Sequence, residues 1–447
     1  MRNDLTGGSV PKTLLKFAVP YLIACFLQTF YGLTDLFVTG QFNGAGVISA
    51  VSIGSQITHM LTVMIVGLAM GSTVIISNAV GAKEPERIAR GIGNTVSMFA
   101  VFSVGATLAL VLSVNGILSA IATPKESFDE AGRYLLICFW GVPFIVAYNV
   151  LSSIFRGLGD SKSPMYFVAV AGVINIVLDV LFIGPLHMRA AGAALATVIS
   201  QAASVAFALL MLRRRGLGVR LTRQDFRFRR EILTNLLRVG VPVSVQDGII
   251  QISFLVITAI ANSRGVAAAA GVGIVEKIIS FLFLVPSAML SSISAIAAQN
   301  AGAGLHKRGR SVLYCGMVFS VAFGIVVGVI GQFVPVQVLT LFARGEDEVI
   351  RLGSQYLRSY VWDCAFASVH FCFSGYFCAY GKSLYSFLHN LISTVCVRVP
   401  GAYFASVLFP ATLLPMGMAA PAGSFVSAVI CVVIFRRMLS RMQRAGM

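Results

Sequence analysis

The segment Leu15-Lys-Phe-Ala-Val-Pro20 opens a long apolar stretch near the start of the chain, and Leu237-Arg-Val-Gly-Val-Pro242 opens another in its second half. Three further pairs of segments match in the same order at a separation of about 221 residues. They are Ser49-Ala-Val-Ser-Ile53 with Ala270-Gly-Val-Gly-Ile274, Asn78-Ala-Val-Gly-Ala82 with Gln299-Asn-Ala-Gly-Ala303, and Phe155-Arg-Gly-Leu-Gly159 with Phe377-Cys-Ala-Tyr-Gly381. Four ordered matches indicate an internal repeat that covers both halves of the chain.

The composition indicates an integral membrane protein. Of the 447 residues, 57% are hydrophobic and only 11% are charged, whereas soluble domains carry about 25% charged residues. The apolar residues form blocks long enough to cross a bilayer, which takes about 20 residues of helix. Few segments alternate as strands do, so the blocks predict helices and not a β-barrel. Twelve blocks begin near residues 14, 48, 93, 132, 165, 190, 237, 267, 312, 355, 385 and 418.

The connectors between these blocks alternate in charge, and this alternation predicts the orientation. Roughly 25 Lys and Arg residues lie in one set of connectors and about 6 in the other, and basic connectors stay in the cytoplasm. The basic set holds Lys83, Arg87, Arg90, Arg156, Lys162, eight arginines from Arg213 to Arg230, Lys307, Arg308, Arg310, Arg436, Arg437, Arg441 and Arg444. We therefore expect a multi-pass protein of a prokaryotic inner (plasma) membrane with both termini in the cytoplasm.

Each repeat covers six predicted helices, an even number, so both copies insert with the same orientation. Parallel repeats of this kind enclose a central cavity and can move against each other. The repeat predicts an N-terminal six-helix domain at residues 1–212, an Arg-rich solvated connector at 213–235 and a C-terminal six-helix domain at 236–447. Pro20 and Pro242 lie early in the first helix of each repeat, where a proline favours a bend, and are candidate gating positions.

The repeat and its motifs resemble the multidrug and toxic compound extrusion (MATE) family over essentially the whole chain. The motifs are Gly81-Ala82, Gly302-Ala303, Arg156-Gly-Leu-Gly-Asp-Ser-Lys-Ser-Pro164 and Asn175-x-x-x-Asp179. The resemblance implies an all-α membrane fold of twelve transmembrane helices in two parallel six-helix repeats, forming a V-shaped, pseudo-twofold bundle. It also implies secondary active efflux of small compounds, driven by H⁺ or Na⁺, through two lobes that open alternately.

Four oxygen-bearing side chains of the first repeat are predicted to lie at one depth in the membrane. Asp35 follows Lys16 by 19 residues, about 28 Å along a helix, which places it in the outer third. Asp179 lies five residues before the exterior Gly184, and Asn175 shares its helix face one turn earlier. Thr197 reaches the same depth from the outside. Carboxyl groups in a membrane indicate function by default, so these residues form our candidate coupling site.

This site has two chemical interpretations and one structural alternative. Two carboxylates in an apolar pocket repel each other when both are ionised, so one is expected to hold a proton. The same oxygens, with the Asn175 amide and the Thr197 hydroxyl, suit Na⁺. Alternatively, Asn175 and Asp179 only form interhelical hydrogen bonds. The resemblance is closer to the DinF-type branch of the family, whose proposed cation site matches these positions. It is less close to the NorM-type branch, because Asp363 does not fit the NorM-type spacing and the seventh helix lacks the expected glutamate.

Further polar residues in the second repeat are candidates for the cavity or for substrate contact. Gln246 and Asp247 follow the Pro242 bend, and either faces the cavity or pairs with a neighbour. Glu276 is adjacent to Lys277, so the two point to different faces of their helix. Arg398, just before Pro400, is expected to close a salt bridge. His59, His370 and His389 are isolated in the sequence and are interpreted as packing or hydrogen-bonding residues.

Several other functions are excluded or stand as alternatives. The net charge of +17 lies in short connectors, which argues against nucleic acid as a partner. The segment Gly375–Ser383 has five residues between its glycines where a phosphate-binding loop needs four, so ATP hydrolysis is not expected. No Ser-His-Asp order, metal-binding quartet or catalytic cysteine is evident in the sequence, so no other enzyme activity and no cofactor are expected. The expected partners are membrane lipids and a small amphipathic substrate, cationic or neutral, and the expected state is a monomer. A lipid-linked precursor flippase of the same superfamily remains the alternative function.

Overall fold

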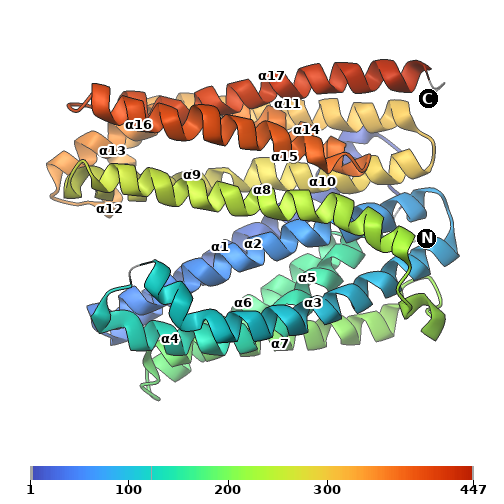
Figure 1. Ribbon diagram of the computed structural model, residues 1–447, viewed down its shortest axis with the longest axis horizontal. Helices are drawn as coiled ribbons and strands as arrows, with labels where there is room; N and C mark the ends of the chain where they lie inside the picture. The colour runs from blue at the N-terminus through green and yellow to red at the C-terminus, as the bar shows by residue number, and fades with distance from the viewer. Residues whose placement is uncertain (1–3, 122, 445–447) are drawn as a thin grey trace. The chain divides into compact units, whose positions relative to one another are not determined.

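The computed structural model describes residues 4–121 and 123–444, and every regular element within them is helical (Figure 1). The first half contains α1 Val10–Phe42, α2 Ala45–Gly81, α3 Pro85–Ala120, α4 Lys125–Trp140, α5 Val142–Gly157, α6 Lys162–Ile183, α7 Arg189–Arg215 and the short η1 Arg223–Phe226. The second half contains α8 Arg230–Asn262, α9 Val266–Leu282, α10 Leu284–Gly302, α11 His306–Phe333, α12 Pro335–Phe342, α13 Asp347–Tyr360, α14 Asp363–Ala379, α15 Ser383–Ser393, η2 Thr394–Arg398, α16 Val399–Leu408 and α17 Leu414–Arg444.

Each of the twelve predicted blocks falls on one long helix or on one broken helix. Within the described residues, ten continuous or nearly continuous helices are long and apolar enough to cross a membrane. The pair α4 and α5, bent by 48°, makes an eleventh. The tenth block corresponds to α13 and α14, of 14 and 17 residues, each too short to span alone. Breaks therefore concentrate in the fourth block of each half.

The chain folds into two compact units. Unit 1 contains Val19–Gly240, and unit 2 contains Leu5–Ala18 and the chain from Val241 onward. The chain thus passes from one unit to the other inside α1 and inside α8, two residues before Pro20 and two residues before Pro242 in each case. The packing boundaries therefore differ from the predicted domain boundaries.

The first turns of α1 belong to unit 2 because specific contacts hold them there. Leu14 is fully buried and lies against Gly316 of α11. The Leu5 amide donates to Gln299 Oε1 at 3.2 Å, and Arg308 donates to the backbone oxygens of Gly8 and Gly7 at 2.7 and 2.6 Å. A hydrophobic anchor and three hydrogen bonds therefore fix this segment before the helix continues into unit 1.

The Arg-rich connector is not a freely solvated linker, which corrects the expectation from its composition. Asn94 of α3 donates to the Asp225 backbone oxygen at 3.2 Å and accepts from the Arg229 amide at 2.8 Å. Ser97 donates to the Phe226 oxygen at 2.8 Å. A Cβ at Gly93 would come within 2.3 Å of the Asp225 oxygen, so only glycine permits this close approach. Backbone groups, which composition does not reveal, dock the connector on α3.

The repeat is visible in the turns that end equivalent helices. Gly159 and Gly381 both have a positive φ, of 86° and 67°. The residue after each glycine donates back to a phenylalanine oxygen, Asp160 to Phe155 and Lys382 to Phe377, at 2.8 Å in both halves. The φ angle is also positive at Lys83 (57°) and at its repeat partner Gly304 (72°). The two halves therefore share their turn geometry as well as their sequence pattern.

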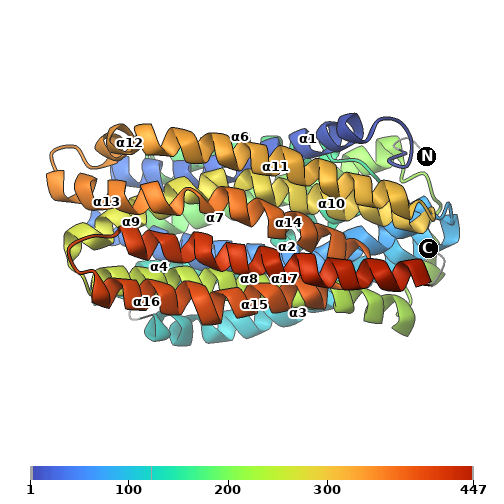
Figure 2. The ribbon, with the colours of Figure 1, turned by 90° about the horizontal axis from the view of Figure 1, so that it is seen from above.

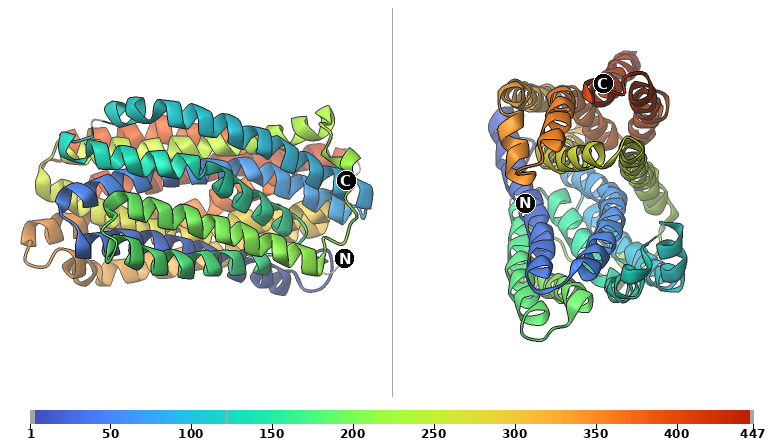
Figure 3. Two further views of the ribbon diagram at one scale, coloured as in Figure 1. Left: turned by 90° about the horizontal axis from the view of Figure 1, so that it is seen from below. Right: turned by 90° about the vertical axis from the view of Figure 1, so that its left-hand side faces the viewer.

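Within each unit the long helices run side by side, and small residues set their spacing (Figures 2 and 3). In unit 1, a Cβ at Gly71 would lie 2.2 Å from the Leu236 oxygen, and one at Gly240 would lie 2.3 Å from the Leu68 oxygen. Backbones in membranes approach this closely only at small residues, because packing rather than water exclusion drives helix association there.

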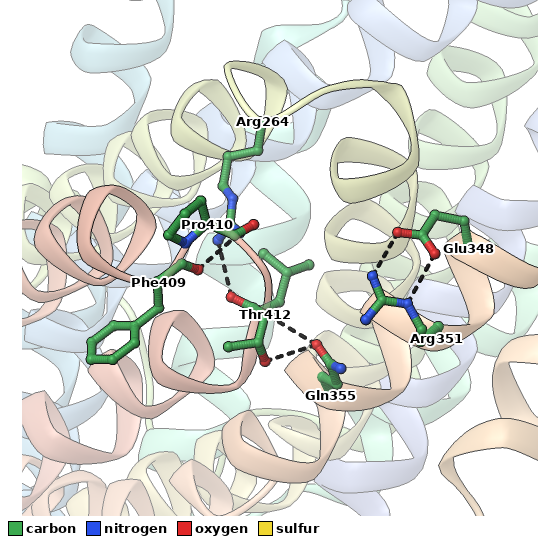
Figure 4. Close-up of polar contacts among 8 residues, drawn as sticks. Arg264, Glu348, Arg351, Gln355, Phe409, Pro410 and Thr412 are labelled. Atoms are coloured by element: carbon green, nitrogen blue, oxygen red, sulfur yellow. Dashed lines mark hydrogen bonds and ion pairs between the residues drawn. The ribbon is translucent and has the colours of Figure 1, made fainter.

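One end of unit 2 is held by an arginine at the turn between α8 and α9 (Figure 4). Arg264 donates to the backbone oxygens of Phe409 and Thr412 at 3.1 and 3.2 Å, and also to that of Pro410. The Thr412 hydroxyl in turn donates to Gln355 of α13 at 2.9 Å. These carbonyls lie in the turn that follows α16, so the arginine caps the C-terminal end of that helix.

Candidate cation and substrate sites

The four residues of the predicted coupling site come from three helices of unit 1 and lie near the same helix ends. Asp35 lies two turns before the end of α1, Asp179 one turn before the end of α6, and Thr197 two turns after the start of α7. Asn175 is one turn before Asp179 on the same face of α6. The structure brings all four together.

The carboxyl group of Asp35 is the centre of this cluster. It lies within hydrogen-bonding reach of Asp179, Asn175 and Thr197. The contact with full hydrogen-bond geometry is the weak one from Thr197 Oγ1 to Asp35 Oδ2, at 3.4 Å. Asp35 is 4% exposed, and Asn175 and Asp179 are completely buried. Two buried carboxyl groups this close are not both ionised without a cation between them.

Several polar atoms of the cluster lack a protein partner among the described residues. They are Asp35 Oδ1, both carboxyl oxygens of Asp179 and both amide atoms of Asn175. Such orphaned groups cost about 1–3 kcal/mol each when buried. The donor set is therefore incomplete in a way that a proton or a small cation bound by oxygen ligands would complete.

The neighbours of the two carboxyl groups in the described part of the chain are uncharged side chains. Within the described residues, no lysine, arginine or histidine acts on Asp35 or Asp179 electrostatically. The neighbours in electrostatic range of Asp35 include Tyr31, Tyr134 and Cys138, all neutral. Any compensation of negative charge here must come from an exchangeable proton or ion.

The two candidate gating prolines lie inside continuous helices, Pro20 in α1 and Pro242 in α8. Each follows the position where the chain passes between the units. Because proline removes one backbone hydrogen bond from the helix interior, these are the two places where α1 and α8 bend most easily.

Gln246 and Asp247, just beyond Pro242, have different environments. Gln246 is buried and accepts a hydrogen bond from Ser386 of α15 at 2.8 Å. Asp247 is only partly buried and lies beside Cys378 of α14. Gln246 therefore joins helices of unit 2, whereas Asp247 keeps part of its surface available.

Glu276 and Arg398 belong to one partly buried polar cluster of unit 2. Glu276 accepts a hydrogen bond from Thr258 of α8 at 3.2 Å, and its second oxygen has no partner among the described residues. Arg398 lies in electrostatic range of Glu276 and of Asp363, which is 1% exposed. No carboxylate in the described part of the chain lies within 4.0 Å of the guanidinium group, so the expected salt bridge is not formed as a direct contact.

Aromatic residues hold Arg398, and the sequence interpretation missed them. The guanidinium group donates to the Tyr360 hydroxyl and lies 4.7 Å from the ring centre of Phe254. Tyr360 is separated from Arg398 by 38 residues and Phe254 by a much longer stretch, so no local pattern links the three. The only sequence signal was an arginine next to Pro400 within an apolar block.

His370 and His389 lie close together in the fold, although they are far from other histidines in the sequence. Their rings lie 5.4 Å apart, on α14 and α15. His389 hydrogen-bonds Ser374 at 3.0 Å and Ser427 at 3.1 Å through its two ring nitrogens. They form a polar link between three helices of unit 2, in keeping with the predicted hydrogen-bonding role.

Comparisons with known proteins agree with this architecture. The profile of the MatE family matches residues 20–181 and again residues 242–404. The probable multidrug resistance protein YoeA of Bacillus subtilis is 28% identical over 431 residues, covering 94% of this chain and 92% of the relative. The probable multidrug resistance protein NorM of Thermotoga maritima is 24% identical over 454 residues, covering 98% and 93%.

Solved structures match the fold over nearly the whole chain. A crystal structure of a MATE protein in complex with MaL6 superimposes with a TM-score of 0.92 at 21% identity, covering 98% of both chains. This likeness confirms the predicted all-α membrane fold with twelve transmembrane helices in two repeats. The two matches to the family profile begin at Pro20 and Pro242, the same prolines that mark the repeat in the sequence. The chain is a membrane transporter and belongs to the MatE family, the multidrug and toxic compound extrusion family that its motifs resemble.

Proposed function

We propose that this transporter exports small amphipathic or cationic compounds in exchange for H⁺ or Na⁺, and that Asp35, Asn175, Asp179 and Thr197 bind the coupling cation. The observation that carries the proposal is the set of orphaned oxygens in unit 1. Two buried carboxyl groups with no fixed positive charge nearby have to gain and lose a cation if their environment changes during transport. One charge moving across 100 mV supplies about 2.3 kcal/mol, before any concentration gradient is added.

Alternating access supplies the coupling in this proposal. Binding of a cation at Asp35 and Asp179 favours one conformation, and binding of substrate favours another, because a ligand with equal affinity for both states shifts neither. Bends at Pro20 and Pro242, where α1 and α8 pass between the units, are the proposed places of movement. Asp247 and Glu276 are the proposed contacts for a cationic substrate, because each keeps part of its surface exposed.

The basic connectors are placed in the cytoplasm in this proposal, with both termini on the same side. The coupling cluster, at the opposite helix ends, then lies in the outer half of an inner membrane. A cation enters it from outside and is released inside. We expect the chain to work as a monomer.

Dye uptake into everted membrane vesicles, which corresponds to export from the cell, tests the proposal, with H⁺ and Na⁺ gradients applied separately. We expect Asp35→Asn and Asp179→Asn each to abolish gradient-driven transport while the protein remains in the membrane. Asp129→Asn, an exposed position on α4, is the matched control and should transport like the wild type. Transport that survives both changes would show that coupling occurs elsewhere. Absence of dye transport by the wild type would favour the lipid-linked precursor flippase, to be tested with a fluorescent lipid-linked sugar.

A further inference from the structure

The repeat relates α6 of unit 1 to the segment α15–η2–α16 of unit 2. The matches to the family profile begin 222 residues apart, at residues 20 and 242, but end 223 residues apart, at residues 181 and 404. The second copy therefore contains one extra residue. The π-turn η2, Thr394–Arg398, accounts for it, because a π-helical hydrogen bond encloses one residue more than an α-helical one.

The π-turn is the place in unit 2 that corresponds to Asn175. Gly159 pairs with Gly381 before the turn at a separation of 222, and the family profile matches end at a separation of 223, so Asn175 falls at Val397 or Arg398, inside the turn. The helix turn that holds an amide in the candidate site of unit 1 thus holds a guanidinium group in unit 2. A Cβ at Gly423 of α17 would lie 2.9 Å from the Ser393 hydroxyl, so a glycine is needed where α17 passes this turn.

The environment of Arg398 resembles the coupling site of unit 1 in its acids and differs from it in its fixed charge. Two carboxyl groups, Glu276 and Asp363, lie in electrostatic range, and each has one buried oxygen without a partner in the described part of the chain. Tyr356, Tyr360 and His370 are the other titratable groups that interact with the guanidinium group. Lys277 is exposed. In unit 1 the two acids, Asp35 and Asp179, lie on other helices of the repeat and have no basic neighbour among the described residues.

We propose that Arg398 is a resident cation, which permanently occupies in unit 2 the electrostatic role that an exchangeable cation has in unit 1. This inference rests on the proposed function only for the identity of the cation site in unit 1. An arginine side chain does not lose its proton in proteins, so its charge stays in place through the whole transport cycle. The hydroxyl of Tyr360 and the ring of Phe254 keep it there. Unit 2 then neither takes up nor releases the coupling ion, and all coupling runs through unit 1.

The test uses purified full-length protein in lipid nanodiscs and counts bound cations directly. Binding of ²²Na⁺ at pH 8 and proton uptake between pH 8 and pH 6 are measured for the wild type and for the variant with both Asp35→Asn and Asp179→Asn. The double variant lacks the site of unit 1, so it reports on unit 2 alone. We expect it to bind one coupling cation fewer than the wild type and none through unit 2.

Adding Arg398→Gln to the double variant should create a new cation site, because Glu276 and Asp363 lose their compensating charge. We expect about one additional Na⁺ or proton per chain. Arg398→Lys, which keeps the charge and changes the shape, should add none. A gain with lysine as large as with glutamine would assign the effect to packing and overturn the proposal.

Two other outcomes also overturn it, and the first does not need the glutamine variant to fold. One is residual Na⁺ binding or coupled proton uptake in the double variant that Asp363→Asn removes, because unit 2 would then exchange cations despite Arg398. The other is a folded Arg398→Gln variant, eluting as a single species, that gains no cation. If instead the wild type and the double variant bind the same number of cations, the proposed site of unit 1 fails, and the comparison of the three variants at Arg398 still decides the role of the arginine.

Discussion

Replacing Asn94 with alanine should release the connector between the two halves from α3. The Asn94 side chain makes two hydrogen bonds to the connector, one to the Asp225 oxygen at 3.2 Å and one from the Arg229 amide at 2.8 Å. Asn94 is completely buried, and its amide also donates to the Arg90 oxygen within α3 at 3.0 Å. Alanine fits an α-helix well, so the change removes the docking contacts without disturbing α3 itself.

The size of the effect follows from the two lost contacts. Each intramolecular hydrogen bond contributes about 1 kcal/mol net, so the docked state loses about 2 kcal/mol. Since about 1.4 kcal/mol corresponds to a factor of ten in an equilibrium constant, the undocked population should rise about 30-fold. The bonds of Ser97 to Phe226 and the turn around Asp225 remain, which limits the loss to the connector and leaves the helices folded.

Limited trypsin digestion measures this population, because the connector offers Arg223, Arg227, Arg229 and Arg230 as cleavage sites. When docking is fast relative to cleavage, the cleavage rate follows the undocked population. We expect cleavage between Arg223 and Arg230 to accelerate about 30-fold in Asn94→Ala. The exposed Asn115→Ala on the same helix is the matched control and should change nothing. Equal rates for Asn94→Ala and wild type would refute the docking. Cleavage in everted but not in right-side-out vesicles would support the cytoplasmic placement.

Three further predictions concern stability. Lys83 has a φ of 57°, a conformation that is unfavourable for residues other than glycine, and its repeat partner is Gly304. Lys83→Gly should therefore stabilise the protein by about 1 kcal/mol and raise Tm by about 2–4 °C in a thermal unfolding scan. Gly304→Ala should lower Tm by as much. The backbone amide and the hydroxyl of Thr222 donate to the Asp225 carboxylate and lower its pKa. The contribution of Asp225 to docking is therefore present above the ordinary aspartate pKa of about 3.9 and is lost only as the pH falls through the lower folded value. Hydrogen exchange of the connector, corrected for its intrinsic rate, should be equally slow at pH 7.5 and pH 5.5, and faster at both in Asp225→Asn. Arg264→Ala leaves three carbonyls after the end of α16 without their charged donor, so it should lower the free energy of unfolding by about 2 kcal/mol and lower Tm. Arg351→Ala breaks only an exposed ion pair and should leave Tm within about 1 °C of the wild type.

The fold was predictable because the signals that specify it are periodic and additive. Each membrane span needs about 20 apolar residues, and no single residue decides whether it forms. The repeat added a second, independent constraint, since a feature such as the Gly159 turn had to recur at Gly381. Packing boundaries were harder to predict. Nothing in the composition of Leu5–Ala18 indicates that this segment binds Gln299 and Arg308 in the other half of the chain, or that Leu14 is buried there.

The clustering of Asp35, Asp179 and Thr197 was predictable for a physical reason that does not apply to the cluster around Arg398. Helices that cross a bilayer convert position in sequence into depth, so Asp35, Asp179 and Thr197 were expected at one level before any contact was known. The cluster in unit 2 depends on a π-turn, which shifts the helix face after Thr394 and turns Arg398 toward Tyr360. A uniform helical periodicity cannot represent that shift.

Two halves with the same architecture can carry different chemistry, because a repeat preserves backbone turns such as those at Gly159 and Gly381 but not the charges placed beside them. In unit 1 the meeting point of three helices holds two acids and an amide, with buried oxygens that lack a protein partner in the described part of the chain. In unit 2 the π-turn of the equivalent helix holds Arg398, near two acids that lie on other helices. If one half keeps its charge while the other exchanges it, a cation changes the free energy of one half only, and that asymmetry is what a transporter with two similar halves needs in order to respond to a gradient.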